Sequence, residues 1–310
     1  MSTASVEKAA ELRQSKRPRF SLGNPWSKPR FLVGFTWIYV LWSLLPVLLA
    51  IRFAFNEGRS RTALQGWSTK WFFGDSNFSV FGDPTLQDAL THSLVLAGIA
   101  MLIATPLGIM LAIGLQRWRG RGSGPANVVA LLPLVTPELV FAVGLFLLFT
   151  TVLASIGLGT TAQAIGHVTF SMSFVVVIVR GRLVTIGPDV EEAAADLGAP
   201  PLAVIWRVLL PLLAPAIAAS LLIVFALSID DFVVSQYLAS GSDTTTVPMR
   251  IYAQARAAPT PALNALATLM LAFTLIALGL AYVVFRFLSR GEKGGSAIEQ
   301  IASIDSGGGR

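Results

Sequence analysis

The chain has 310 residues, of which 54% are hydrophobic and only 13% are charged, with a mean hydropathy of +0.68 and a net charge of +6. Soluble domains carry about 25% charged residues, so this chain lacks the polar surface that a soluble protein needs. Cysteine is absent and histidine occurs only twice, which excludes disulfides, thiolate metal sites and a histidine cluster. The sequence therefore predicts an integral membrane protein, in which positive charge indicates orientation rather than nucleic-acid binding.

Six apolar runs follow a basic N-terminal segment. A helix needs about 17–25 apolar residues to cross about 30 Å of hydrocarbon, and it satisfies its own backbone hydrogen bonds there. The first run is too long for the hydrophobic region of a signal peptide, so we expect it to be a span. We predict an all-α integral membrane protein with six transmembrane helices, at Phe31–Ala50, Ser93–Leu115, Val128–Leu153, Ala162–Val179, Leu212–Ile229 and Leu263–Phe285.

The third run contains two prolines and one acid. Pro133 and Pro137 predict a kink, because proline removes a backbone donor and clashes with the preceding turn. Glu138 lies about ten residues into the run, or about 15 Å at 1.5 Å per residue, which is near the middle of a membrane. Carboxylates at this depth are costly and often line a substrate pathway. The alternative is a structural hydrogen bond to a neighbouring helix or to backbone that the prolines free.

Lysine and arginine are distributed unevenly between alternate loops. With the N-terminus inside, 17 of the 23 basic residues fall in inner segments and six in outer ones. The positive-inside rule therefore predicts that both termini are cytoplasmic. We divide the chain into a cytoplasmic N-terminal tail (1–30), a first helix with an outer loop (31–91), a transmembrane domain (92–287) and a flexible cytoplasmic tail (288–310).

The loop at residues 181–211, between the fourth and fifth runs, has the composition of a short helix followed by a turn. Asp189 is placed to cap the helix, and Glu191 and Glu192 fall in its first turn, where the helix dipole favours acids. Gly198 is expected to end the helix, and the two prolines after it prevent continuation. An ordinary connector could have the same local composition.

The same loop resembles the signature loop of permease subunits of ABC importers. It contains E-A-A, three residues, a glycine, nine residues and then V-L-L-P, where the family has I-x-L-P, so valine replaces isoleucine. The resemblance covers about residues 92–287. It implies a type I ABC importer permease fold in which the loop is a coupling helix seated on an ATPase subunit. The residues implied in that contact are Glu191, Glu192, Ala193, Ala194, Asp196, Leu197, Gly198 and Pro211.

An ATP-binding motif is missing from the chain. No G-x-x-x-x-G-K-[ST] occurs, and none of the five lysines follows a glycine, whereas a P-loop needs that lysine at the phosphates. ATP and Mg²⁺ are therefore expected on a separate ATPase chain, and we expect this chain to be a transport subunit with no catalytic or metal-ligating residues. The resemblance implies two ATPase copies, a second similar permease and an extracytoplasmic substrate-binding protein, assembled at a bacterial cytoplasmic membrane.

Four stretches resemble the spermidine/putrescine permeases of the second-permease type. They are Leu131–Phe149, Ile165–Leu183, Ser228–Gly241 and Val247–Leu269. Permeases for other small solutes share parts of these stretches. The resemblance implies a small cationic substrate, a polyamine, with another small solute as the alternative.

Two further acids, Asp230 and Asp231, close the fifth run on its outer side. Consecutive helical residues point about 100° apart, so at most one of them is expected to face a pathway squarely. Together with Glu138 they would form an acidic route that suits an ammonium group. The alternative for the aspartates is simple solvation at the membrane surface. We interpret His167 as a packed residue that hydrogen bonds between helices.

The outer segments, residues 51–88 and 231–262, carry acids and aromatic side chains. They could receive a substrate-binding protein, or they could simply cap the helix ends. An ion-coupled secondary transporter could use Glu138 as an ion site, but it would have no use for the signature loop. A membrane enzyme would need a cluster of His, Cys or Asp side chains, which the sequence does not contain.

Overall fold

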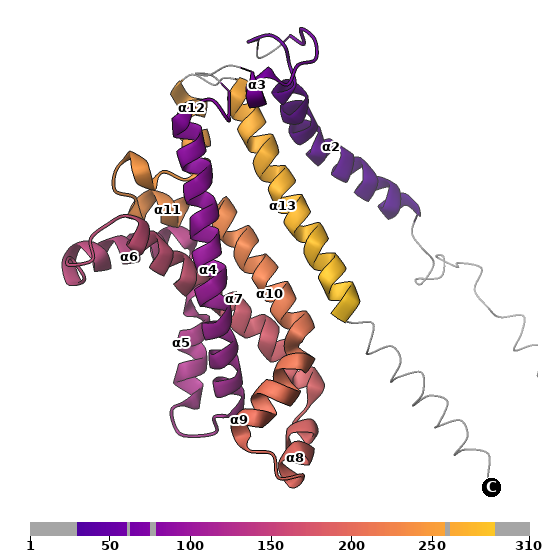
Figure 1. Cartoon of the computed structure of the whole chain (residues 1–310), viewed down its shortest axis with the longest axis vertical. Helices are drawn as coiled ribbons and strands as arrows, with labels where there is room; N and C mark the ends of the chain where they lie inside the picture. The colour runs from indigo at the N-terminus through magenta and orange to yellow at the C-terminus, as the bar shows by residue number, and fades with distance from the viewer. Residues whose placement is uncertain (1–29, 61–62, 75–78, 258–260, 289–310) are drawn as a thin grey trace, which may run out of the picture. The chain divides into compact units, whose positions relative to one another are not determined.

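The computed structural model describes residues 30–60, 63–74, 79–257 and 261–288 (Figure 1). Within these ranges the chain is helical and forms no β-strand, only an isolated bridge between Asn56 and Trp67. The chain divides into two compact units, residues 1–49 and 50–310, and the boundary falls within the first long helix.

Five described helices are long and apolar enough to cross a membrane, and one bent pair of helices makes a sixth candidate span. The predicted six runs therefore correspond to five continuous helices and one broken one. The continuous helices are α2 (Arg30–Ala54), α4 (Pro84–Arg117), α7 (Thr160–Ile186), α10 (Leu210–Asp230) and α13 (Pro261–Leu288).

The first unit contains most of α2. None of its apolar stretch is buried within the described structure, and the large side chains of Trp37, Ile38 and Trp42 are all exposed. A helix that is hydrophobic on every side needs lipid or another protein around it. This pattern agrees with the predicted first span.

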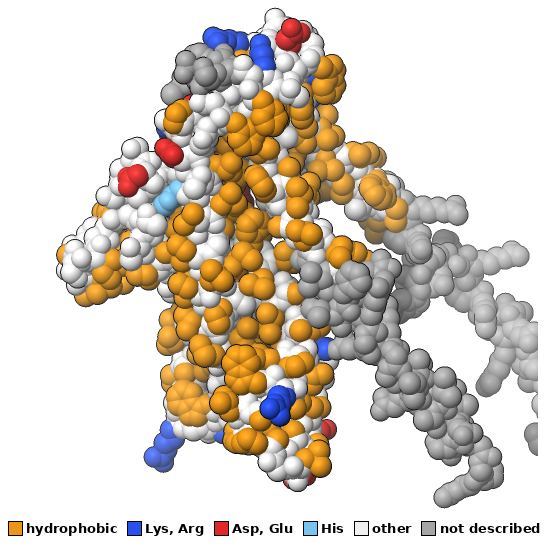
Figure 2. Space-filling model, viewed as in Figure 1, with side chains coloured by type: hydrophobic (Ala, Val, Ile, Leu, Met, Phe, Trp, Pro, Cys, Tyr) orange, Lys and Arg blue, Asp and Glu red, His pale blue; other side chains and the backbone are white. Residues whose placement is uncertain are grey.

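In the second unit, α4, α7 and α10 pack against one another around a core of small and branched side chains. Ala100 and Ala104 on α4 and Val175 and Val176 on α7 are fully buried there. Small residues let helices approach closely, which is how membrane helices gain packing energy without a hydrophobic drive. Figure 2 shows hydrophobic side chains covering most of the visible face along α4 and α10, as a lipid-facing surface requires.

The broken span consists of α5 (Ser123–Val135) and α6 (Glu138–Leu147), which meet at an angle of 107°. The kink expected at a proline pair is therefore a full change of direction (Figure 1). It occurs at Pro137 alone, because Pro133 lies within α5. Thr136 has ψ 131°, the extended conformation that a following proline imposes. A π-helical turn, η1 (Leu148–Val152), continues α6.

Short elements connect the long helices of the second unit. At one end α3 (Lys70–Phe73) and α12 (Val247–Ala257) share a core with α13, in which Trp71 and Leu266 are buried. The other short elements are α11 (Val233–Leu238), η3 (Ser242–Thr244), α8 (Asp189–Asp196), α9 (Pro201–Val204) and the π-helical η2 (Ile205–Leu209). Helices α9, η2 and α10 run on as one stretch from Pro201 to Asp230.

Close packing of α4 on α7 leads to a first prediction. A Cβ added at Gly108 would lie 2.6 Å from Cβ of Val175, closer than real contacts allow, so Gly108→Ala should destabilise the fold by about 1–3 kcal/mol. Gly98, in the same helix, has nothing within 4 Å of the equivalent position, so Gly98→Ala is the control. Thermal unfolding in detergent, followed by tryptophan fluorescence, should show a lower midpoint for Gly108→Ala only. Equal midpoints would contradict the tight contact.

Candidate functional site

The loop after α7 forms the short helix α8, as the sequence predicts, but the start of this helix differs from the prediction. Pro188 occupies the cap position and Asp189 is the first helical residue, with no side chain bonded to the helix start, so the predicted Asp189 cap is wrong. The physical reason is the turn just before it, where Gly187 has φ +77° and the proline ring then fixes the entry of the chain. Glu191 and Glu192 still lie in the first turn.

The other end of α8 is closed by a glycine turn. Gly198 has φ +80°, its N–H donates to the carbonyl of Ala195 at 2.8 Å, and the N–H of Ala199 donates to the carbonyl of Ala194 at 3.1 Å. This pair of bonds is a Schellman motif, which satisfies carbonyls that a helix end otherwise leaves open. Gly198 therefore ends α8, as the sequence predicts.

Most of the predicted coupling residues form one exposed surface. Glu192, Ala193, Asp196 and Gly198 are exposed on α8, and Leu197 is 89% exposed, an unusual state for a leucine. Among the rest, Ala194 is half-buried, and Pro211 lies apart in the first turn of α10. An exposed apolar side chain ringed by acids and alanines is a surface to which another protein can bind.

Glu191 differs from the other acids of α8 because it faces inward. Its carboxylate pairs with the guanidinium of Arg117, the last residue of α4, and both side chains are only partly exposed. The contact holds α8 against the end of α4. The sequence analysis did not predict this ion pair, because the two residues are 74 positions apart and nothing in the sequence around Arg117 indicates a partner for its charge.

Asp231 lies in the break between α10 and α11 and organises the backbone there. Its Oδ2 accepts from both the backbone N–H and the hydroxyl of Ser235 at 2.7 Å, and its Oδ1 accepts from the N–H of Val234 at 3.4 Å. The carboxylate thus caps α11. Simple solvation at a membrane surface, the alternative considered for Asp231, does not fit a side chain only 11% exposed.

His167 is buried on α7 and contacts both sides of this break. Its Nδ1 lies 2.7 Å from the hydroxyl of Ser228, while its Nε2 lies 3.0 Å from the hydroxyl of Ser235 and 3.2 Å from Oδ2 of Asp231. The imidazole therefore joins α7, α10 and α11. The structure agrees with its interpretation as a hydrogen-bonding residue between helices.

A second buried side chain, Gln163, extends this polar region along α7. Its amide nitrogen donates to the carbonyls of Ser235 at 2.9 Å and Thr244 at 3.0 Å, and its oxygen lies 2.8 Å from Nε2 of His92 on α4. Sequence reasoning did not single out Gln163. The feature that could have identified Gln163 in the sequence is a polar amide within an otherwise apolar run.

Glu138 is the first residue of α6, so the 107° break determines where it lies. Its carboxyl faces that of Asp231, and Asp230 is also within electrostatic range. The structure thus brings together acids that the sequence had placed at midplane and at the outer mouth. The reason is that α6 runs across the bundle instead of continuing α5.

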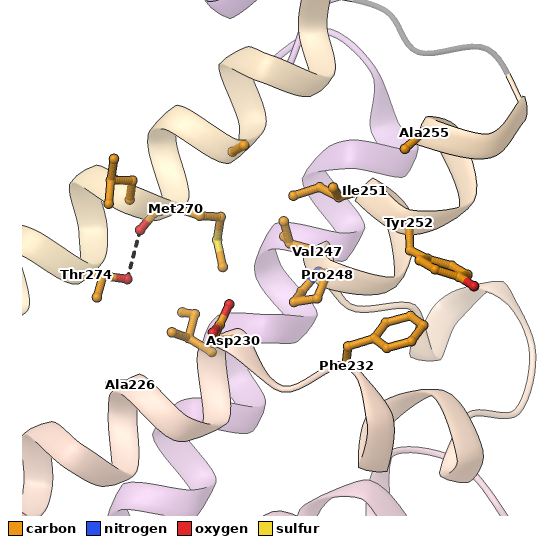
Figure 3. Close-up of a pocket in the computed structure, with 13 residues that line it drawn as sticks. Ala226, Asp230, Phe232, Val247, Pro248, Ile251, Tyr252, Ala255, Met270 and Thr274 are labelled. Carbon is orange, nitrogen blue, oxygen red and sulfur yellow. Dashed lines mark hydrogen bonds between the residues drawn. The ribbon is translucent and has the colours of Figure 1, made fainter. Parts of the chain in front are cut away.

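Asp230 points away from its neighbour, as the angle between consecutive residues predicts. It lies in a cavity of about 720 Å³ between α10, α12 and α13 (Figure 3). Val247, Ile251 and Met270 line its walls with apolar surface.

At one side of the same cavity the rings of Phe232 and Tyr252 lie with their centroids 4.7 Å apart (Figure 3). The guanidinium of Arg256 lies over the Tyr252 ring, 4.4 Å from its centroid. Arg256 therefore already makes a cation–π contact with this ring. The cavity therefore combines one carboxylate, apolar walls and an aromatic edge.

The chain is similar to known transport proteins. Residues 104–290 match the family described as binding-protein-dependent transport system inner membrane component. The chain is 35% identical over 276 residues to the putrescine transport system permease protein PotI of Escherichia coli K12, covering 87% of this chain and 93% of PotI. It is 32% identical over 261 residues to the spermidine/putrescine transport system permease protein PotC of the same strain, covering 84% and 96%.

A solved structure shares the fold. The chain matches, with a TM-score of 0.67 and 18% identity, a bacterial ABC transporter involved in the import of the acidic polysaccharide alginate, covering 84% of this chain and 96% of that one. At this identity the likeness concerns the fold alone. It confirms the predicted ABC importer permease architecture.

The glycine turn of α8 yields a second prediction. Gly198→Ala places a Cβ in a left-handed conformation, which costs about 1–2 kcal/mol, although nothing lies within 4 Å of that Cβ. Amide exchange of residues 189–199 should therefore speed up about 5- to 30-fold, and Gly198→Asn should have a smaller effect. Gly181→Ala is the matched control, because Gly181 has equal space around it but lies within α7. Unchanged exchange in Gly198→Ala would refute the turn's dependence on glycine.

Proposed function

We propose that this chain, which belongs to the family of binding-protein-dependent transport system inner membrane components, conducts a polyamine across the cytoplasmic membrane of a bacterium. It is a multi-pass permease subunit. Its relatives PotI and PotC are named for the transport of putrescine and of spermidine and putrescine. The observation that carries the proposal is the carboxylate of Asp230 in an otherwise apolar cavity, next to the facing acids Glu138 and Asp231.

The chemistry of a polyamine suits this arrangement. Such a molecule carries ammonium groups separated by short methylene segments. Moving an ammonium group out of water is costly unless a counter-charge receives it, and intramembrane acids tend to mark cation pathways. Asp230 offers the counter-charge, while Met270 and Ile251 offer apolar contacts for the methylenes. The ring of Tyr252 adds further apolar surface at one side of the cavity.

The two adjacent aspartates have different roles in this proposal. Asp230 faces the cavity and makes no hydrogen bond within the part of the chain that the structure describes, so its carboxylate can receive a cation. Asp231 is engaged with Ser235 and His167 and acts mainly by fixing the break between α10 and α11. Glu138, opposite Asp231, extends the acidic route from the α6 side.

Energy for transport is supplied, in the same proposal, by two copies of a partner ATPase that bind ATP and Mg²⁺. The exposed surface of α8, with Leu197 at its end, is the docking site for one of them. A second, similar permease completes the pathway, and an extracytoplasmic binding protein delivers the substrate. Both termini of this chain are then cytoplasmic, as the distribution of lysine and arginine predicts.

Neutralising the cavity acid tests the substrate. Asp230→Asn preserves size but removes the charge, and hydrogen bonds to charged groups contribute about 1.5–3 kcal/mol, so uptake should fall about 10- to 100-fold. Radiolabelled putrescine and spermidine uptake should be measured in proteoliposomes that contain the full complex. Glu138→Gln should also lower uptake, whereas Asp231→Asn should instead lower the yield of folded protein.

The control for this experiment is Asp88→Asn, because Asp88 is an exposed acid of α4 that lies outside the cavity. It should transport normally. Normal uptake of both polyamines by Asp230→Asn and Glu138→Gln would remove the acidic pathway from the proposal.

A separate prediction concerns docking of the ATPase. Leu197→Ser removes the most exposed apolar side chain of the α8 surface, so the ATPase should co-purify in smaller amounts and substrate-stimulated ATP hydrolysis should drop severalfold. Leu202→Ser, at a leucine that is 67% exposed beyond the glycine turn, is the matched control. If both variants retain the ATPase fully, α8 is not the docking element.

A further inference from the structure

Two cavities lie next to each other at the α8 end of the bundle. The first has a volume of about 450 Å³ and is lined by Arg117, Arg119 and Glu191 together with the ends of α4 and α7. Polar and apolar side chains contribute about equally to its lining, and it opens where α4 ends and the chain turns toward α5. Neither cavity belongs to the acidic site described above.

The second cavity, of about 280 Å³, lies between α5 and α7. Leu131 and Val177 line it with apolar surface, and Arg180 adds one charged group. Gln116 and Val184 line both cavities, so the two spaces are adjacent. A partly polar cavity therefore lies beside an apolar one.

Two arginines in this region keep a positive charge that no acid balances. Arg117 is neutralised by its ion pair with α8. Within the described ranges, Arg180 donates to neutral amides, those of Asn127 and, at 3.4 Å, a glutamine of α4, and forms no ion pair. Arg119 is exposed and has no ion-pair partner among the described residues. The combined space thus carries an uncompensated charge of two.

The position of Arg180 matters as much as its charge. It lies six residues before the end of α7 at Ile186, or about 9 Å along the helix. Trp118, which is 47% exposed at the end of α4, is the kind of side chain that marks the boundary between headgroups and acyl chains. The paired cavities therefore lie across this boundary. The arginines lie at the depth of the headgroups, and the apolar lining lies at the depth of the acyl chains.

We propose that the two cavities form one binding site for an anionic phospholipid, with the headgroup phosphate at the arginines and an acyl chain along Leu131 and Val177. Basic spaces between transmembrane helices favour such headgroups. Guanidinium groups bind phosphate oxygens in a bidentate manner. The hydrogen bonds from Arg180 to the neighbouring amides fix the orientation of its guanidinium group. The site does not depend on which solute the chain transports.

A lipid fits the site better than a segment of a cytoplasmic protein. Val177 and Leu131 belong to helices that cross or enter the membrane, and Val177 is 46% exposed on α7. A partner in the cytoplasm could reach Arg119 on its loop, but it could not cover the apolar cavity beyond it. Free phosphate would fill only the partly polar cavity.

The site can be tested by native mass spectrometry of the purified full-length chain in detergent. Dioleoyl phosphatidylglycerol and dioleoyl phosphatidylcholine share their acyl chains and differ in headgroup charge. An arginine near a lipid surface contributes about fivefold in affinity, so two should favour phosphatidylglycerol about 25-fold. Arg119→Gln should reduce the preference about fivefold, and the double variant with Arg180→Gln should abolish it.

Arg121→Gln is the matched control, because Arg121 lies on the same loop as Arg119 but lines neither cavity, and it should keep the full preference. Equal binding of the two lipids by the native chain would overturn the proposal, as would displacement of phosphatidylglycerol by millimolar inorganic phosphate alone. If Arg180→Gln does not fold, Arg119→Gln decides: an unchanged preference overturns the lipid site. Loss of ATPase co-purification in Arg119→Gln with lipid preference intact would assign the arginines to a protein contact instead.

Discussion

Breaks in membrane helices leave backbone groups that water cannot reach, so the protein itself must bond them. Here Gln163 on α7 does so, by donating to the backbone carbonyls of Ser235 and Thr244. His167, one turn away on the same face, hydrogen bonds the hydroxyls of Ser228 and Ser235 on either side of the α10–α11 break. Together with the apolar packing of α11 against α6 and α7, these bonds place α11 and the acids beside it.

Features with local causes were predictable from the sequence, and features with distant causes were not. The apolar runs and the glycine end of α8 follow from residues within a few positions of each other. The Arg117–Glu191 pair joins positions 74 apart, and the bonds of Gln163 join positions 72 and 81 apart. Proline chemistry predicted a kink at Pro137, but its direction depends on what α6 packs against.

One helical stretch connects the α8 end to the candidate substrate cavity. It runs from Pro201 to Asp230, 30 residues or about 45 Å, and it includes the π turn η2 near its start. Because α8 packs on α9 and η2, a displacement of α8 can reach Asp230 through a continuous element.

Asp230 and Asp231 are joined by a single peptide bond, yet one faces an apolar cavity and the other faces His167. Their separate environments follow only from the rotation between consecutive residues. Substitutions at either position alter one environment at a time. Inserting or deleting one residue before the pair would rotate both carboxyls together, so the length of α10 before this junction is constrained as strictly as the two carboxyls themselves.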